Sequence, residues 1–114
     1  MLQYQNKNYV CHIDLAMDLI RGKWKAVILC HLNDEPKRFL ELQRITCGVS
    51  QKVLNQKLSE LEKNGLIYKT TYPEVPPRVE YSLTELGTEL FPALDLLEKW
   101  AVKNFPDKGQ CNNN

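Results

Sequence analysis

Apolar residues recur at helical spacing through the first half of the chain. Ile13, Ala16, Met17 and Ile20 lie three or four positions apart, which predicts a short amphipathic helix that Gly22 interrupts. The same kind of spacing predicts two further short helices, over 23–32 and 37–45.

The next predicted helix, SQKVLNQKLSELEKNG, has two unlike faces. Ser50 is a good N-cap because its hydroxyl can accept a hydrogen bond from a first-turn amide, and Gly65 supplies a left-handed C-cap. One face carries the apolar residues Val53, Leu54, Leu58 and Leu61, and the other carries Lys52, Asn55, Gln56, Ser59 and Lys63. Amide, hydroxyl and ammonium groups read base edges and phosphates, which favours a DNA-reading helix; the alternative is a solvated face.

After Gly65 the pattern changes to the alternation of β-strands. Residues 66–72 are rich in β-formers and 79–83 alternate apolar with polar, with PEVPPR between them. Three prolines fix φ and offer no amide, so they predict a projecting hairpin with a rigid tip and Arg78 at its base.

A long helix follows the hairpin at once. Thr84 is its predicted N-cap, Glu85 to about Phe105 its extent, and Pro92 should kink it or loosen one turn. Its apolar band is wider than a small helical core can cover, which indicates a partner subunit. The order of elements predicts a mainly α fold with a small β-hairpin, a winged helix-turn-helix.

Bulk properties set the limits of this prediction. We expect a single domain over 1–105, with a polar, disordered tail over 106–114. No apolar run approaches the roughly 18 to 20 residues that span a bilayer, so we expect a cytoplasmic protein.

Residues 37–78 carry eight bases and four acids, a local balance of +4 within a chain of net charge +1. A basic middle segment is typical of contact with a polyanion.

Four stretches resemble a known family, and they extend over roughly Cys11 to Trp100. RGKWKAVILCHL, KRFLELQRI, GVSQKVLNQKLSELEKNGLI and YPEVPPRVEYSLTELG closely resemble the HxlR-type family of bacterial winged-helix transcription regulators. The resemblance implies a homodimeric DNA-binding repressor or activator, with dimer contacts from the N-terminal and C-terminal helices.

The resemblance also implies which residues contact DNA. Ser50, Gln51, Lys52, Asn55 and Gln56 would lie in the major groove. Lys69, Arg78 and the prolines would lie in the wing, which is the predicted hairpin after Gly65. For Arg78 an alternative remains open, because pairing with Glu74 or Glu80 would simply hold the hairpin together.

Some members of the family sense oxidants or electrophiles through a cysteine just before the first helix, where Cys11 stands here. The alternative is a small core hydrophobe beside Tyr9, Val10 and Ile13. Cys47 is the second candidate sensor, because it precedes the capped polar helix. The four cysteines form no C-x-x-C pair, which fits reduced thiols.

Together these features predict a homodimer that binds double-stranded DNA at an imperfect palindrome with half-site centres about 10 bp, or a multiple, apart. An oxidant or electrophile is the expected effector, and a small pocket between subunits for an aromatic effector is another option. We expect no cofactor, no metal site and no enzymatic activity, because nucleophile, phosphate-loop and metal-ligand spacings are missing from the sequence. The alternative from another class is a protein-interaction module, which would show an apolar exposed face on 50–64.

Overall fold

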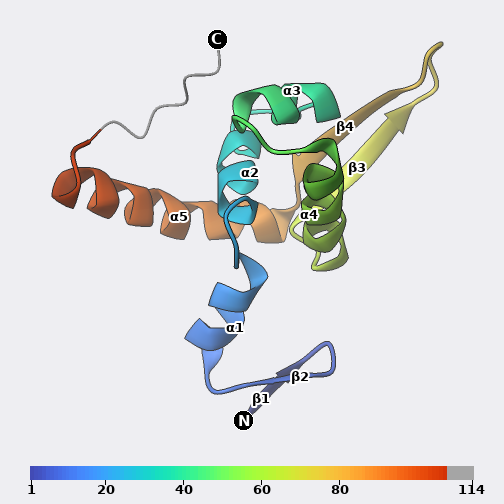
Figure 1. Ribbon diagram of the computed structural model, residues 1–114. Helices are drawn as coiled ribbons and strands as arrows, with labels where there is room; N and C mark the ends of the chain where they lie inside the picture. Colours follow the sequence, from blue (N-terminus) through green and yellow to red (C-terminus); the bar gives the residue numbers. More distant parts are fainter. Residues whose placement is uncertain (108–114) are drawn as a thin grey trace.

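The computed structural model describes residues 1–107 of the 114-residue chain. The elements follow one another in this order: β1 (Leu2–Tyr4), β2 (Lys7–Tyr9), α1 (His12–Leu19), α2 (Lys25–Leu32), α3 (Phe39–Ile45), α4 (Gln51–Lys63), β3 (Ile67–Tyr72), β4 (Arg78–Leu83) and α5 (Glu85–Asn104) (Figure 1). Most of the predicted tail, from residue 108 on, lies outside the described residues. Over the described part, none of the helices combines the length and apolarity needed to cross a bilayer.

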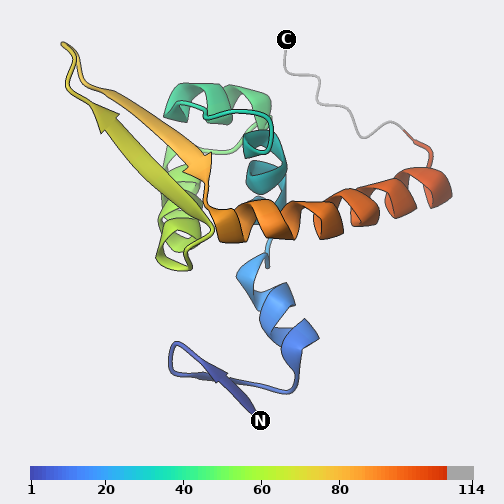
Figure 2. The same ribbon diagram turned by 180° about the vertical axis from the view of Figure 1, so that it is seen from behind.

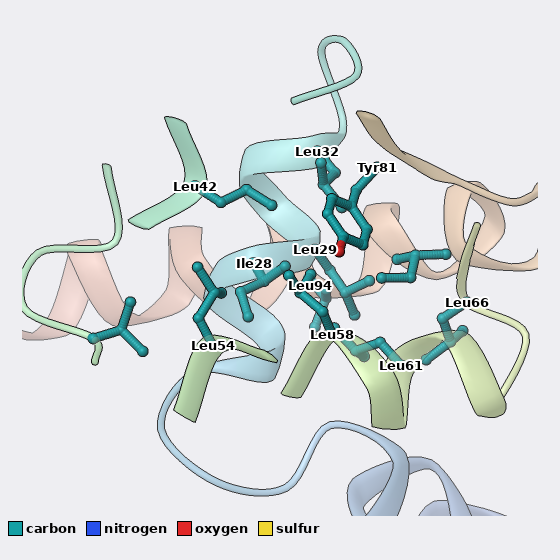
Figure 3. Close-up of a cluster of buried hydrophobic side chains, with 12 residues drawn as sticks. Ile28, Leu29, Leu32, Leu42, Leu54, Leu58, Leu61, Leu66, Tyr81 and Leu94 are labelled. Carbon is teal, nitrogen blue, oxygen red and sulfur yellow. The ribbon is translucent and has the colours of Figure 1, made fainter. Parts of the chain in front are cut away.

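The core lies between α2, α3 and α4 and is closed by the inner ends of the hairpin and of α5. Leu54, Leu58 and Leu61 are buried on the inner side of α4, as their spacing predicts, and face α2. Figure 3 shows them gathered around Ile28 and Leu29 of α2. Burying one such side chain contributes about 1.5 to 3 kcal/mol, so this face fixes the orientation of α4.

Both predicted caps of α4 are confirmed. The Ser50 hydroxyl accepts a hydrogen bond from the Val53 amide at 3.1 Å. At the other end Gly65 has φ of 75°, the left-handed conformation that glycine adopts without steric cost. The chain then turns back, and the Leu66 amide donates to the Leu61 carbonyl at 3.0 Å. The helix therefore has a defined start and a defined stop.

Strands β3 and β4 form the predicted hairpin. They pair antiparallel from Ile67 opposite Leu83 to Tyr72 opposite Arg78. The inner end is anchored by buried Tyr81, whose backbone exchanges two hydrogen bonds with Lys37 at 2.8 and 3.0 Å. The tip, 73–77, is exposed. Figures 1 and 2 show the hairpin projecting beyond the end of α4 that Ser50 caps.

The last helix, α5, is fastened to the core only over its first half. The Thr84 hydroxyl accepts from the Gly87 amide at 3.1 Å and donates to the Gly65 carbonyl at 2.6 Å. Leu94 is the last buried residue, and beyond it the helix runs out past α2 (Figure 2). Pro92 lies inside this helix without ending it, and its exposed position keeps its ring away from the core.

The fold differs from the prediction at the N-terminus, where a second hairpin precedes α1. Strands β1 and β2 pair antiparallel, from Leu2 opposite Tyr9 to Tyr4 opposite Lys7. Gln5 and Asn6 turn the chain with φ of 47° and 65°, the positive values that tight hairpin turns require. The expectation of one small β-hairpin was therefore wrong. The predicted first helix exists, but none of its residues is buried.

Candidate nucleic-acid interface

Helices α3 and α4 are joined by a short turn that reverses the chain. Cys47 and Gly48 both have positive φ, 57° and 99°. Thr46 is buried and satisfied, because its hydroxyl donates to the Leu42 carbonyl at 2.6 Å. Val49, also buried, anchors the end of the turn just before Ser50. The two helices and this turn form a helix-turn-helix unit held by the shared core.

The outer face of α4 presents the polar side chains that the sequence singled out. Gln51, Lys52, Asn55 and Gln56 are all exposed, and Ser50 sits at the start of the same face. Gln56 donates to the Glu60 carboxylate at 3.3 Å. Within residues 1–107, the side chains of Lys52 and Asn55 form no hydrogen bond or ion pair. The structure therefore brings five of the predicted residues together on one rigid surface, with donors and acceptors available to a ligand.

Behind this face an ion pair ties α4 to α2. Lys25 is buried at 7% exposure, and its Nζ lies 2.9 Å from Oε1 of Glu60. The hydrogen bond from Lys25 lowers the pKa of Glu60. Sequence reasoning missed this pair, because Lys25 lies in an otherwise apolar stretch and nothing local indicates its partner.

The two basic residues predicted for the wing have different surroundings. Lys69 is exposed on β3, and in the described part of the chain its ammonium has no partner. Arg78 is instead held on three sides. Its guanidinium lies 3.0 Å from Glu74 and 2.8 Å from Glu80, and its central carbon is 4.0 Å from the ring centroid of Tyr72. These contacts favour the alternative in which Arg78 holds the hairpin.

The three cysteines within residues 1–107 lie in different environments. Cys11 is exposed and occupies the N-cap position of α1 with extended backbone. Cys30 is half-buried on α2, and burial, followed by the nearby Glu98 and Asp95, raises the pKa of its thiol. Cys47 is disulfide-bonded. Among residues 1–107 no group of three histidine, cysteine or acidic side chains is placed to hold a metal ion.

A second surface, which we call the apolar flank, is made by exposed apolar residues of α1 and of the outer half of α5. Ile13 is 65% exposed and Met17 46% on α1. Leu97 is 52% exposed and Trp100 60% on α5. Large apolar side chains that gather on an exposed surface are typical of interaction sites.

Comparison with known proteins agrees with this geometry. A family model described as HxlR-like helix-turn-helix matches residues 19–109. The HTH-type transcriptional regulator YtcD of Bacillus subtilis is 43% identical over 101 residues, which cover 89% of this chain and 80% of YtcD.

Two solved structures add to this. The redox regulator HypR in its oxidised form is 40% identical with a TM-score of 0.79, covering 82% of this chain and 97% of that chain. The reduced form of the transcriptional regulator YodB from B. subtilis is 35% identical with a TM-score of 0.74, covering 89% and 99%. The chain therefore belongs to the HxlR-like helix-turn-helix family, a family of transcriptional regulators and not of enzymes.

Proposed function

We propose that this regulator binds double-stranded DNA sequence-specifically by inserting α4 into the major groove. The observation that carries the proposal is the outer face of α4, where Lys52 and Asn55 are exposed while the opposite face is locked by buried leucines. The major groove of B-DNA is about 12 Å wide and admits one helix. The same face is polar, so it does not suit the apolar contacts of a protein-interaction module.

We assign separate roles to the residues of this interface. Ser50, Gln51, Lys52, Asn55 and Gln56 contact bases and phosphates, and Lys69 contacts the neighbouring backbone from the wing. Arg78 acts by holding the wing rigid through Glu74 and Glu80.

Replacing Asn55 with alanine tests the base-reading role. An asparagine amide makes paired hydrogen bonds to adenine, so its loss should weaken binding to the cognate operator by about 1 to 3 kcal/mol. Binding to unrelated DNA should hardly change, because the lost contact carries sequence information. Fluorescence-anisotropy titrations with operator and scrambled duplexes at equal salt measure both.

The matched control is Asn8→Ala, an exposed asparagine on β2 outside the proposed interface. It should leave both affinities unchanged. An Asn55→Ala loss of equal size on the two duplexes would show a general contact and contradict base reading.

We further propose that the apolar flank forms the interface of a homodimer. Two copies of one surface related by a two-fold axis would cover the exposed residues of α1 and α5 and place two α4 helices side by side. The operator should then be an imperfect palindrome with half-site centres about 10 bp, or a multiple, apart. A regulator acting on DNA in this way works in the cytoplasm.

Regulation through a thiol is proposed at Cys11. Structural neighbours include a redox regulator, HypR, solved in oxidised and reduced forms. Cys11 is exposed and lies beside the apolar flank, so a modification there would act on the proposed dimer contact. The effector class is an oxidant or a small electrophile. Cys47, the second choice, is disulfide-bonded and so is not among the free thiols of the described residues.

Alkylation rates should separate Cys11 and Cys30, the free thiols among residues 1–107. Cys11 should react with iodoacetamide several times faster than Cys30 at neutral pH, because Cys30 is half-buried and its raised pKa lowers its thiolate fraction. Peptide-level mass spectrometry over time gives both rates in one sample. Cys11→Ser and Cys30→Ser variants assign each rate, and a Cys11 rate no higher than that of Cys30 would remove Cys11 as the sensor.

A further inference from the structure

A cavity of about 480 Å³ lies between the N-terminal hairpin, the end of α1 and the C-terminal half of α4. On the hairpin side, Asp18 is the centre of a charged cluster. Tyr9 donates its hydroxyl to this carboxylate at 2.7 Å, Lys7 lies 3.5 Å away and Arg21 pairs with it directly. The Tyr9 hydrogen bond, followed by that of Arg21, lowers the pKa of Asp18. The carboxylate is therefore ionised at neutral pH.

The opposite wall is formed by α2 and α4. Glu60 pairs with Lys25 at 2.9 Å and with Lys57 at 3.7 Å, and its pKa is lowered by these partners. Lys63, one turn further along α4, also lines the cavity. Its ammonium forms no ion pair with any residue from 1 to 107. Gln5 of the hairpin turn, which also lines the cavity, donates to the Lys63 carbonyl at 3.5 Å.

The charges on the cavity wall do not cancel. Five cations and two carboxylates line it, which leaves an excess of three positive charges. Helices α1 and α4 both end at the cavity, and each helix C-terminus contributes about half a negative charge. Neutralising the partial negative charges of these two helix ends therefore uses about one of the three excess positive charges. Among the residues that line the cavity, about two positive charges therefore remain unbalanced.

We propose that this cavity binds a small polyanion with two or more negative charges, of the phosphate-ester or polycarboxylate class. Its volume falls in the range of about 300 to 1,000 Å³ that is usual for small-molecule sites and exceeds what a simple halide needs. Tyr4 and Tyr9 add flat, partly apolar wall beside the cations, which suits an organic anion. The site lies at the end of α4 opposite to Ser50, away from the proposed DNA-reading residues.

Bound anion would draw two separate elements together. Lys7 belongs to the N-terminal hairpin and Lys63 to α4, and the long Gln5 hydrogen bond links the hairpin turn to that helix. An anion between them would fasten the hairpin to the end of α4. This role is independent of DNA binding and is tested without DNA.

Isothermal titration with inorganic pyrophosphate and, separately, with citrate is the direct test, at an ionic strength held constant with sodium chloride. One anion should bind per chain. The double variant Lys7→Gln/Lys63→Gln should lose about tenfold or more in affinity, because two charges at the site are removed. Both lysines make little packing contact, and thermal unfolding of the variant checks that the fold is kept.

The matched control removes two lysines from the proposed DNA face, Lys52→Gln/Lys69→Gln, and should keep full affinity for the anion. Binding of pyrophosphate alone would point to phosphate esters, citrate alone to polycarboxylates, and both to recognition by charge. No saturable binding of either anion would overturn the proposal. So would a loss confined to the control variant, since the anion would then occupy the DNA face.

Discussion

Replacing Gly87 with alanine should lower the free energy of unfolding by about 3 kcal/mol, the upper range for overpacking a buried position. A Cβ at this position would lie 2.2 Å from the Leu66 carbonyl oxygen and 3.2 Å from Cδ2 of Leu83. The Leu66 backbone has little freedom to move, because its amide bonds to Leu61 at 3.0 Å and its carbonyl accepts from Thr84 at 3.1 Å. Either α5 or the start of the wing must shift.

The direction of the change in stability distinguishes a buried Gly87 from an exposed one. At an exposed helical position the same substitution would stabilise by about 1 kcal/mol, because alanine is the better helix former. Urea unfolding followed by circular dichroism measures the difference. Thr88→Ala, the next residue and an exposed one, is the control and should change stability by less than about 0.5 kcal/mol. Equal stability of the two variants would show that α5 does not approach Leu66 this closely.

Replacing Leu97 with glutamate should separate the proposed dimer and weaken operator binding by about 100-fold or more. The substitution places a charge in the apolar flank, where an interface would have to desolvate it. A dimer that binds two linked half-sites has an affinity about two to four orders of magnitude higher than a monomer that binds one. A dissociated monomer loses this gain. Sedimentation velocity reports the assembly, and a DNA titration at about 150 mM salt, roughly physiological ionic strength, reports the affinity.

Leu86→Glu is the matched control for this experiment. Leu86 is 52% exposed, as Leu97 is, and lies on the same helix, but in the first turn that packs near the core. It should leave the dimer intact. A Leu97→Glu protein that still sediments as a dimer would place the interface elsewhere, and a wild-type protein that sediments as a monomer would remove the dimer from the proposal.

Local signals account for what the sequence predicted well. The helix from Ser50 to Gly65 combines a hydroxyl cap, a glycine stop and leucines at helical spacing, all within one short segment. The hairpin of β3 and β4 was predicted equally well from its β-formers and prolines. The N-terminal hairpin escaped prediction because its strands are three residues long, too short for an alternation of apolar and polar residues to stand out. Asn6 in its turn was a further local signal.

Side-chain partners across the fold were much harder to predict. The hairpin register places Tyr72 opposite Arg78, and this pairing brings an aromatic ring against the guanidinium. Sequence reasoning named Glu74 and Glu80 as alternative partners but had no means to weigh them against phosphate. The Lys25–Glu60 pair joins residues 35 positions apart, so only the packing of α2 on α4 reveals it.

The joint at Thr84 has a mechanical consequence. The Thr84 hydroxyl links the start of α5 to the Gly65 carbonyl, just where α4 ends and the wing begins. These three elements therefore meet at one joint. The 20 residues of α5 make a lever about 30 Å long at about 1.5 Å per residue. If α5 and the core move as one rigid body, a tilt of about 10° about the outer end of α5 would displace the Thr84 end by about 5 Å, more than the axial rise of one base pair, about 3.4 Å. In a dimer held together through the outer part of α5, a small change of angle at the subunit contact would therefore move the two α4 helices out of register with their half-sites.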